Sequence, residues 1–598
     1  MAIAAIDRRT LLASAGATAL MAAAPVKVPA ADAALARLLQ RHVDLFLQRC
    51  PEEATSSGFD DAAMRRRLTD RSLAAMATDR VAIKQAVAEL GAIDARGLSP
   101  RSAEDLDVAK FVYSTFADLL GRYGYIDIDL RPSPYVVSQM NGAYYWLPDF
   151  LGQRHPLATP ADADAYMARL GGLAVALDQE SERIAHDAGI GVVPPGFVID
   201  KTIAQITALR DGNPAASAII EPAVARGGPG FPAAQAAALF RSAVVPALTR
   251  QIEALSKLRA TAVDTAGVWR LPDGDAYYAA SLRANTTTGI APAEMHRIGL
   301  EQAATLTAEL DRALRAQGYT SGSVGERIGA MNKDPRFLKS PDDAGRKALI
   351  AYVQDVLADA RARLPKMFNA VAVAPLIVRR IPVAVENGSP GAFYDPGPPG
   401  QPGIFSLNLR SPTDQPTWRL PTLAHHEGIP GHHFQASALD SAAALSPFRK
   451  IVRFSSYTEG WALYAEQLAD EMGCYEADAA GRIGYLQSML FRAGRIVVDT
   501  GIHHHRWTQA QAVQWMVEHV GEQAIPAARE IVRYCVYPGQ ACSFKVGQTQ
   551  IFAAREAARR ALGPRFDVRG FHDVVLLGGP MPMQTLAAAV ERWAKSRG

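Results

Sequence analysis

The sequence contains few cysteines, and this scarcity excludes two classes of protein. Cysteine occurs four times in 598 residues, at Cys50, Cys474, Cys535 and Cys542, which is too sparse for a small scaffold held together by disulfides. No two of them are spaced as Cys-x-x-Cys, so a zinc site built from such a pair is excluded. Cys535 and Cys542 could still form one disulfide in an oxidising compartment.

The sequence also lacks an excess of charge of one sign. Lys and Arg total 63 against 60 Asp and Glu, and the basic residues are not gathered into a stripe interleaved with aromatics, so no nucleic-acid partner is predicted. Apolar residues make up 49% of the chain and charged residues 21%, which is typical of a folded globular protein. The length exceeds a usual single domain, so we expect two lobes or one large body around a cleft.

No long apolar run suitable for a membrane span is present. Near the N-terminus, Arg8 and Arg9 precede an uncharged, alanine-rich stretch that ends at Ala24, which is the layout of a twin-arginine export signal rather than of a span. The alternative is an amphipathic or frayed N-terminus. We predict that residues 1–30 are a signal peptide and linker read by the twin-arginine export machinery, and that the mature protein is periplasmic without a stable membrane anchor.

Apolar residues at helical spacing dominate the remaining chain, whereas strand signals are sparse. The pattern predicts one domain over 31–598, with a helical part over about 31–370 and a part over about 371–598 that holds the chemistry. The fold class is therefore mainly α with a small β-sheet. Helices are predicted within 31–120 and over 161–188, 232–258, 293–316, 342–364, 420–440, 456–472, 484–503 and 510–535, and strands over 378–385 and 403–409.

Four of the 13 histidines lie in one short stretch, 423–435. His426 and Glu427 begin an arrangement like His-Glu-x-x-His, in which two imidazoles one turn apart hold zinc and the glutamate is the general base. Pro430 stands where the second histidine would be and removes a helical amide, so the helix must kink or bulge there. A bulge of two residues would bring His432 to the metal and one of three would bring His433. We favour His432, because His433 would lie roughly 10 Å along an unbroken helix.

A third ligand is predicted at Glu459, 33 residues after His426. This separation permits a second, antiparallel helix that faces the first. Apolar neighbours would bury the carboxylate, and a buried carboxylate needs a cation or another partner. The alternative is a glutamate near a helix N-terminus that the helix dipole stabilises. Glu466, seven residues later, is either a support of the site or a solvated side chain.

Two segments carry a resemblance to a known family. His426 to Gln435 and Glu459 to Tyr464 resemble signatures of the bacterial DUF885 family, and the similarity extends over nearly all of the chain after the signal segment. The resemblance implies a zincin-like, gluzincin-related metallopeptidase: a large helical body around a cleft, a small sheet next to the metal helix, one Zn²⁺ ion and peptide hydrolysis. Phe544 departs from the pattern, because the family often carries a tyrosine there. Further matching segments are 147–151, 155–157, 194–198, 498–503 and 538–541.

A peptidase of this type also needs residues that support the metal and the substrate. Arg492, Arg495, Asp499 and His503 recur at spacings of three or four and so share one helix face. Asp499 could hold a metal-bound imidazole, and either arginine could bind a peptide carboxylate. His503, Tyr534 or Tyr537 could stabilise the oxyanion, with His503 and Tyr537 preferred. The alternative is a structural network of ion pairs.

The function predicted from the sequence is a zinc-dependent peptidase in which Glu427 takes a proton from the attacking water and returns it to the leaving amine. The ligands are His426, His432 and Glu459, and the substrate is a peptide or a small amide. The strand at 405–409 could pair with an extended peptide. Two alternatives remain: a metal-dependent amidase or esterase for a non-peptide substrate, and a non-catalytic periplasmic binding or scaffold protein.

Overall fold

The structure is a computed structural model that describes residues 29–126, 132–369, 371–383, 386, 391–397, 401–442 and 445–597. The predicted signal segment, apart from its last two residues, lies outside the described residues. No helix in the described part of the chain has the length and apolar character needed to cross a membrane. Cys535 and Cys542 are both free thiols, so the disulfide that they could have formed is not made.

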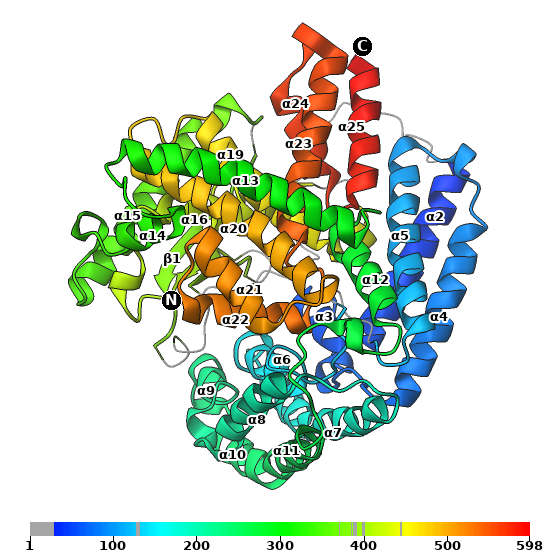
Figure 1. Ribbon diagram of the computed structural model, residues 1–598. Coiled ribbons are helices and arrows are strands. Elements are labelled where there is room, and N and C mark those ends of the chain that lie inside the picture. Colours follow the sequence, from blue (N-terminus) through cyan, green and yellow to red (C-terminus); the bar gives the residue numbers. More distant parts are fainter. Residues whose placement is uncertain are drawn as a thin grey trace, which may run out of the picture.

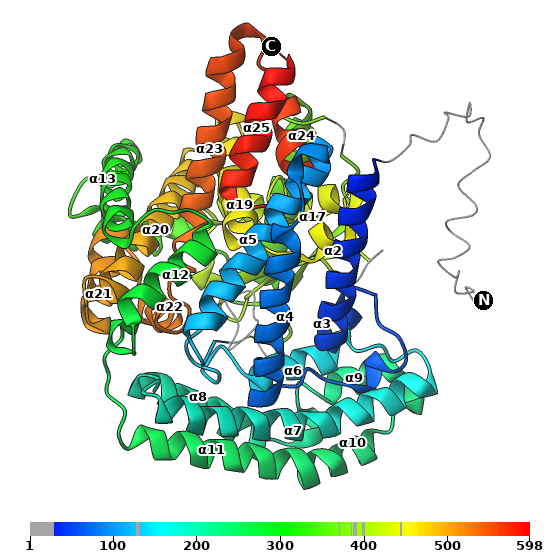
Figure 2. The same ribbon diagram turned by 90° about the vertical axis from the view of Figure 1, so that its right-hand side faces the viewer.

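The fold is mainly helical with one small sheet, which confirms the predicted fold class. Helices α7, α8, α10 and α11 lie together at one end of the molecule, and α23 and α25 lie at the opposite end (Figures 1 and 2). The first half contains α2 (Ala30–Arg49), α3 (Pro51–Ser56), α4 (Leu73–Gly91), α5 (Pro100–Arg122), α6 (Ala143–Asp149), α7 (Pro160–Gly189), α8 (Gly196–Asp211), α9 (Glu221–Gly227), α10 (Ala233–Leu239), α11 (Val245–Arg259), α12 (Gly274–Thr286), α13 (Pro292–Ala316), α14 (Val324–Met331) and α15 (Asp343–Arg363).

The second half holds the sheet and the helices that surround the candidate site. It contains β1 (Leu376–Arg380), β2 (Ala392–Asp395), β3 (Gly403–Leu407), α16 (Leu420–Glu427), α17 (His432–Ser441), α18 (Pro447–Ile451), α19 (Ser455–Glu471), α20 (Ala479–His503), α21 (Gln509–Trp515), α22 (Ala524–Val536), α23 (Ser543–Leu562), α24 (Val568–Gly578) and α25 (Met583–Arg597). β3, α19 and α20 lie close to the predicted ranges, whereas the range 510–535 contains two helices and no range was predicted for β2, α18, α23, α24 or α25.

The three strands are ordered β1-β3-β2. β3 pairs with β1 in parallel, with Val378 opposite Phe405, and with β2 antiparallel, with Ala392 opposite Leu407. The prediction that the strand at 405–409 pairs with an extended peptide is therefore wrong, because β3 is the middle strand and both of its edges are already bonded. Phe405 and Leu407 instead pack in one buried cluster with Ala424 of α16, so the sheet supports this helix.

The helix predicted over 420–440 is interrupted between α16 and α17, at the place where Pro430 predicts a kink or bulge. Pro430 has no amide to donate. The break also requires a glycine at position 431, because a Cβ there would overlap the carbonyl oxygens of His425 and His426. The break turns the chain so that α17 starts at His432.

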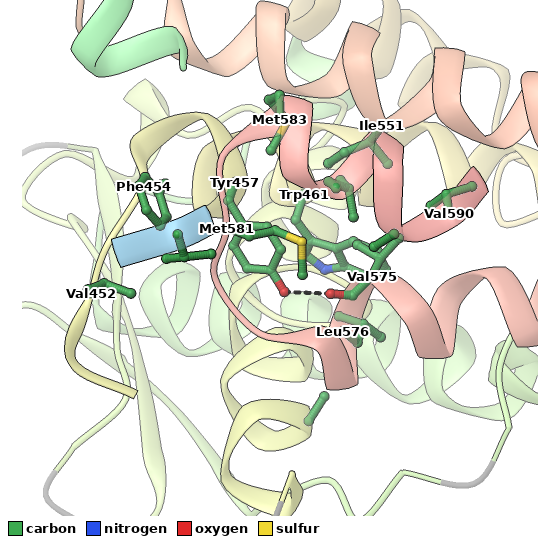
Figure 3. Close-up of a cluster of buried hydrophobic side chains, with 14 of the residues drawn as sticks. Val452, Phe454, Tyr457, Trp461, Ile551, Val575, Leu576, Met581, Met583 and Val590 are labelled. Carbon is green, nitrogen blue, oxygen red and sulfur yellow. Dashed lines mark hydrogen bonds between the residues drawn. The ribbon is translucent and has the colours of Figure 1, made fainter. Parts of the chain in front are cut away.

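Helix α19 is held in place by a buried cluster of apolar side chains (Figure 3). Tyr457 donates a hydrogen bond to the carbonyl of Val575 in α24 at 2.8 Å. Trp461 donates from its indole nitrogen to the carbonyl of Pro430 at 2.9 Å, and its side chain is fully buried. α19 is thus fixed both to the C-terminal helices and to the break between α16 and α17.

Helices α19 and α23 cross at two glycines. A Cβ at Gly547 would overlap the carbonyl oxygen of Ser456 and lie 2.8 Å from the Cα of Gly460. A Cβ at Gly460 would lie 2.6 Å from the carbonyl carbon of Gly547. The backbones therefore approach too closely for any side chain, and this crossing sets the position of Glu459 next to Gly460.

Replacing Gly547 by alanine should force the two helices apart. We expect Gly547→Ala to lower the free energy of unfolding by about 3 kcal/mol, the cost of overpacking against rigid backbone, in urea unfolding followed by circular dichroism. The matched control is Gly329→Ala in α14, where a Cβ meets nothing within 4 Å, and which should gain up to about 1 kcal/mol from helix propensity. Equal stability of the two variants would contradict the close crossing.

Candidate metal centre

Three side chains from three helices converge at one point. His426 lies in the last turn of α16, His432 is the first residue of α17, and Glu459 lies in the first half of α19. One ligand atom from each lies within 4.8 Å of the other two. The Glu459 Oε2 atom is 3.8 Å from His426 Nε2 and 3.4 Å from His432 Nε2. Two imidazoles and a carboxylate at this spacing form a donor set that suits a metal ion.

The break between α16 and α17 decides which histidine joins the cluster. The rings of His426 and His432 lie nearly perpendicular, with centroids 4.9 Å apart. His433 points elsewhere: its Nε2 donates to the carbonyl of Ala374 at 2.9 Å, and its Nδ1 accepts from the Tyr394 hydroxyl at 3.2 Å. The structure therefore places His432, and not His433, beside His426.

The cluster is electrostatically coupled. Burial alone would raise the pKa of Glu459, but His426 and His432 hold it well below its ordinary value. Burial alone would lower the pKa of His426, but Glu459 and Glu466 raise it to about 9. In the absence of a metal, the carboxylates of Glu459 and Glu466 favour the protonated form of His426, because a buried anion needs a positively charged partner.

Glu466 lies about two turns after Glu459 on α19 and forms a hydrogen bond with His426. Its Oε1 accepts from His426 Nδ1 at 2.8 Å, and its Oε2 accepts from the hydroxyl of Thr422 at 2.8 Å. Its side chain is 1% exposed, so Glu466 is not a solvated side chain. Of the two interpretations, the one in which it supports His426 agrees with the structure. Because Nδ1 donates to this carboxylate, the neutral form of His426, which a metal would require, carries its lone pair on Nε2, the atom that faces Glu459.

Asp499, predicted to hold a metal-bound imidazole, lies elsewhere. Its Oδ1 accepts from the Tyr278 hydroxyl at 2.7 Å, and both oxygens accept from the amide of Gly539, at 3.0 and 3.2 Å. The side chain is fully buried and joins α20 to α12 and to the loop before α23. Glu466, and not Asp499, is the carboxylate that accepts from His426, whereas Asp499 is held by Tyr278 of α12 and by the amide of Gly539.

The two residues preferred as oxyanion donors are bonded to backbone groups. His503 Nδ1 accepts from the amide of Val268 at 3.2 Å, and its Nε2 donates to the carbonyl of Tyr534 at 3.0 Å. The Tyr537 hydroxyl donates to the carbonyl of Met140 at 2.9 Å. Both side chains are buried. This geometry ties α20 and α22 to neighbouring segments and gives no support to the predicted oxyanion role.

The two arginines of α20 differ in their partners. Arg495 donates to Glu530 at 2.9 Å and lies over the rings of Phe491 and Phe544. Arg492 lies near the cluster, since its Nη2 is 3.9 Å from Glu466 Oε1. Burial lowers the pKa of Arg492, and the nearby carboxylates partly oppose this effect. The ion-pair network that was the alternative interpretation is therefore found at Arg495, whereas Arg492 lies beside the convergent ligands.

Glu427 and His425 complete the last turn of α16. Glu427 is partly exposed and directly follows His426 at the end of α16. His425 is buried on the other side, where its Nδ1 donates to the carbonyl of Ile429 at 3.0 Å and burial lowers its pKa. His425 thus stabilises the break between the helices, whereas Glu427 is partly exposed.

The fold and this cluster define a mainly helical protein with a two-histidine, one-glutamate site at the meeting of α16, α17 and α19. The chain belongs to the DUF885 family, described as "Bacterial protein of unknown function", whose model matches residues 51–590. No curated protein matches the chain.

Two solved structures are similar to this one. A "putative lipoprotein" from Colwellia psychrerythraea is 31% identical, with a TM-score of 0.90 over 95% of this chain and 100% of that chain. A "putative lipoprotein of unknown function" from Shewanella oneidensis is 16% identical, with a TM-score of 0.66 over 93% and 99%. The second similarity concerns the fold alone.

The buried Asp499 should make stability depend on pH. Burial raises its pKa from 3.8 to about 7, so between these values the folded state keeps a proton that the unfolded state has lost. The stabilising contribution is full below about pH 4 and is lost as the pH rises to 7. We expect Asp499→Asn, which cannot ionise, to gain up to about 4 kcal/mol over the wild type across this window.

The measurement is urea unfolding at pH 5 and at pH 8 for the wild type, Asp499→Asn and a control, Asp107→Asn. Asp107 is an exposed aspartate of α5, so its variant should follow the wild type. Parallel curves for Asp499→Asn and the wild type at both pH values would show that Asp499 ionises normally.

Proposed function

We propose that this chain is a zinc-dependent hydrolase that cleaves peptide bonds, with Glu427 as its general base. The observation that carries the proposal is the convergence of His426, His432 and Glu459 within 4.8 Å. The three come from separate helices, so the arrangement depends on the tertiary fold and not on neighbours in sequence. Membership of the DUF885 family agrees with this proposal but does not assign an activity.

The residues present fit a zinc ion better than a calcium or magnesium ion. Imidazole nitrogen with one carboxylate oxygen is a typical donor set for zinc, whereas calcium and magnesium prefer oxygen ligands alone. Three protein ligands are the usual number in a catalytic site, which keeps one position for water or substrate. The side chains of His432 and Glu459 are 14% and 20% exposed, so this point is open to a small molecule. When bound, zinc supplies the Lewis acidity that activates water.

The surrounding residues have separate tasks in this proposal. Glu466 orients the His426 ring through Nδ1, so that Nε2 presents its lone pair to the ion. Glu427 takes a proton from the attacking water at its carboxylate and gives it to the leaving amine. Its position next to His426 and its partial exposure support this role. Arg492, with its guanidinium beside the ligands, is the candidate substrate-binding group.

Export is the second part of the proposal. Arg8 and Arg9 ahead of the alanine-rich stretch support a twin-arginine route to the periplasm. The similar protein from Colwellia psychrerythraea is described as a lipoprotein, a class that is exported, and this description supports an exported location here. A folded protein that carries a metal is compatible with this route.

The role of Glu427 is tested by Glu427→Gln, which keeps the size of the side chain but cannot accept the proton. We expect hydrolysis of a peptide library to fall by about 10³-fold, while zinc content measured by atomic emission stays at one ion per chain. The control is Glu253→Gln, at an exposed glutamate of α11, which should retain full activity. Unchanged hydrolysis in Glu427→Gln would reject the general-base role, and loss of zinc would show that Glu427 is a ligand.

A further inference from the structure

Arg492 is a partly buried cation with incomplete pairing. Its Nη1 donates to the Ser488 hydroxyl at 2.8 Å, and its one ion pair among the described residues is with Glu466, at 3.9 Å from Nη2. Its Nε is buried and has no hydrogen-bond partner in the described part of the chain. A guanidinium stays charged in a protein and has five N–H donors, so part of its capacity to bind an anion is unused.

Glu466 meets this need only in part, because its Oε1 is 3.9 Å from Arg492 Nη2, beyond hydrogen-bond distance. Its Oε1 already accepts from His426 at 2.8 Å and its Oε2 from Thr422 at 2.8 Å. The contrast with Arg495 is direct, because Arg495 has Glu530 at 2.9 Å. The Nε atoms of both arginines lack a hydrogen-bond partner among the described residues. The two differ in their carboxylates: Arg495 is hydrogen-bonded to Glu530, whereas Arg492 has only Glu466 at 3.9 Å, beyond hydrogen-bond distance.

Arg492 also lies close to the ligands, because its Nη2 is 3.9 Å from the Glu466 Oε1 atom that accepts from His426. Its side chain is 17% exposed, similar to Glu459 at 20% and His432 at 14%. The carboxylates of Glu459 and Glu427 are both near enough to act on its pKa. A molecule that reaches the candidate metal centre therefore comes near the guanidinium as well.

We infer that Arg492 binds a carboxylate of the substrate next to the bond that is cleaved. The inference rests on the proposed function and narrows it: the substrate is a peptide that presents a carboxylate, from its C-terminus or from an acidic side chain. A planar guanidinium with free N–H groups matches a carboxylate in geometry and charge. A free C-terminus offers this group whatever the peptide sequence, and an enzyme that binds it removes residues from the C-terminal end.

The test compares three peptides by calorimetry in the Glu427→Gln background, which binds substrate without consuming it. They are N-acetyl-trialanine with a free carboxylate, the same peptide as its C-terminal amide, and an amidated peptide whose last residue is glutamate. We expect the free acid, or the acidic side chain, to bind at least about 10-fold more tightly than the neutral amide, as for a charge-assisted hydrogen bond. The order of the two acidic peptides identifies the source of the carboxylate.

Substitution of Arg492 separates recognition from structure. In Arg492→Gln the preference for the acidic peptides should fall to about one, and in Arg492→Lys, which keeps the charge but not the planar fork, it should be partly retained. The control is Arg482→Gln on the same helix, because Arg482 pairs with Asp470 at 3.1 Å on the surface; it should keep the full preference.

Three results would overturn the inference: equal binding of acid and amide by the parent protein, an unchanged preference in Arg492→Gln, or an equal loss of all three peptides in that variant. The last would mean that Arg492 acts only through Glu466.

If Arg492→Gln does not fold, as judged by circular dichroism, a full preference in Arg492→Lys contradicts the inference and a reduced one supports it. Failure of the hydrolase proposal is seen separately, as absence of cleavage by the wild type, and the binding comparison still decides the role of Arg492.

Discussion

The interruption of one helix between Glu427 and His432 is the constraint on which the candidate site depends. A continuous helix over 420–440 would separate the two imidazoles along its axis. Pro430 removes an amide, and Gly431 allows the chain to turn against the carbonyls of the preceding turn. The turn places His432 beside His426, with ring centroids 4.9 Å apart. The site is therefore built from a break in regular structure, and the break must itself be stabilised.

The core supplies that stabilisation. Trp461 of α19 donates to the carbonyl of Pro430, and His425 donates to the carbonyl of Ile429, so these two buried carbonyls of the break are satisfied. Helix α19 also carries Glu459 and Glu466 on one face, and its close crossing with α23 at Gly460 fixes the position of α19. The apolar cluster shown in Figure 3 thus fixes the position of α19, and α19 in turn positions the polar side chains of the site.

The sequence predicted the parts of the site that depend on local rules. Helical periodicity gave the fold class, and Pro430 predicted the break and favoured His432 over His433. Glu466 remained undecided, because spacing on α19 shows that it shares a face with Glu459 but not what that face meets. Asp499 and His503 could not be placed, since their partners Tyr278, Gly539 and Val268 are more than 30 residues away in sequence. The position of β3 between β1 and β2 was missed for the same reason: strand order is a tertiary property.

The most direct test of the account is equilibrium zinc binding to the wild type, His432→Gln and His433→Gln. The two variants remove neighbouring imidazoles, and only His432 lies in the cluster. The account predicts one tightly bound zinc ion per chain in the wild type, the same stoichiometry in His433→Gln and its loss in His432→Gln. Zinc retained by His432→Gln but lost by His433→Gln, or no zinc bound by the wild type, would contradict it.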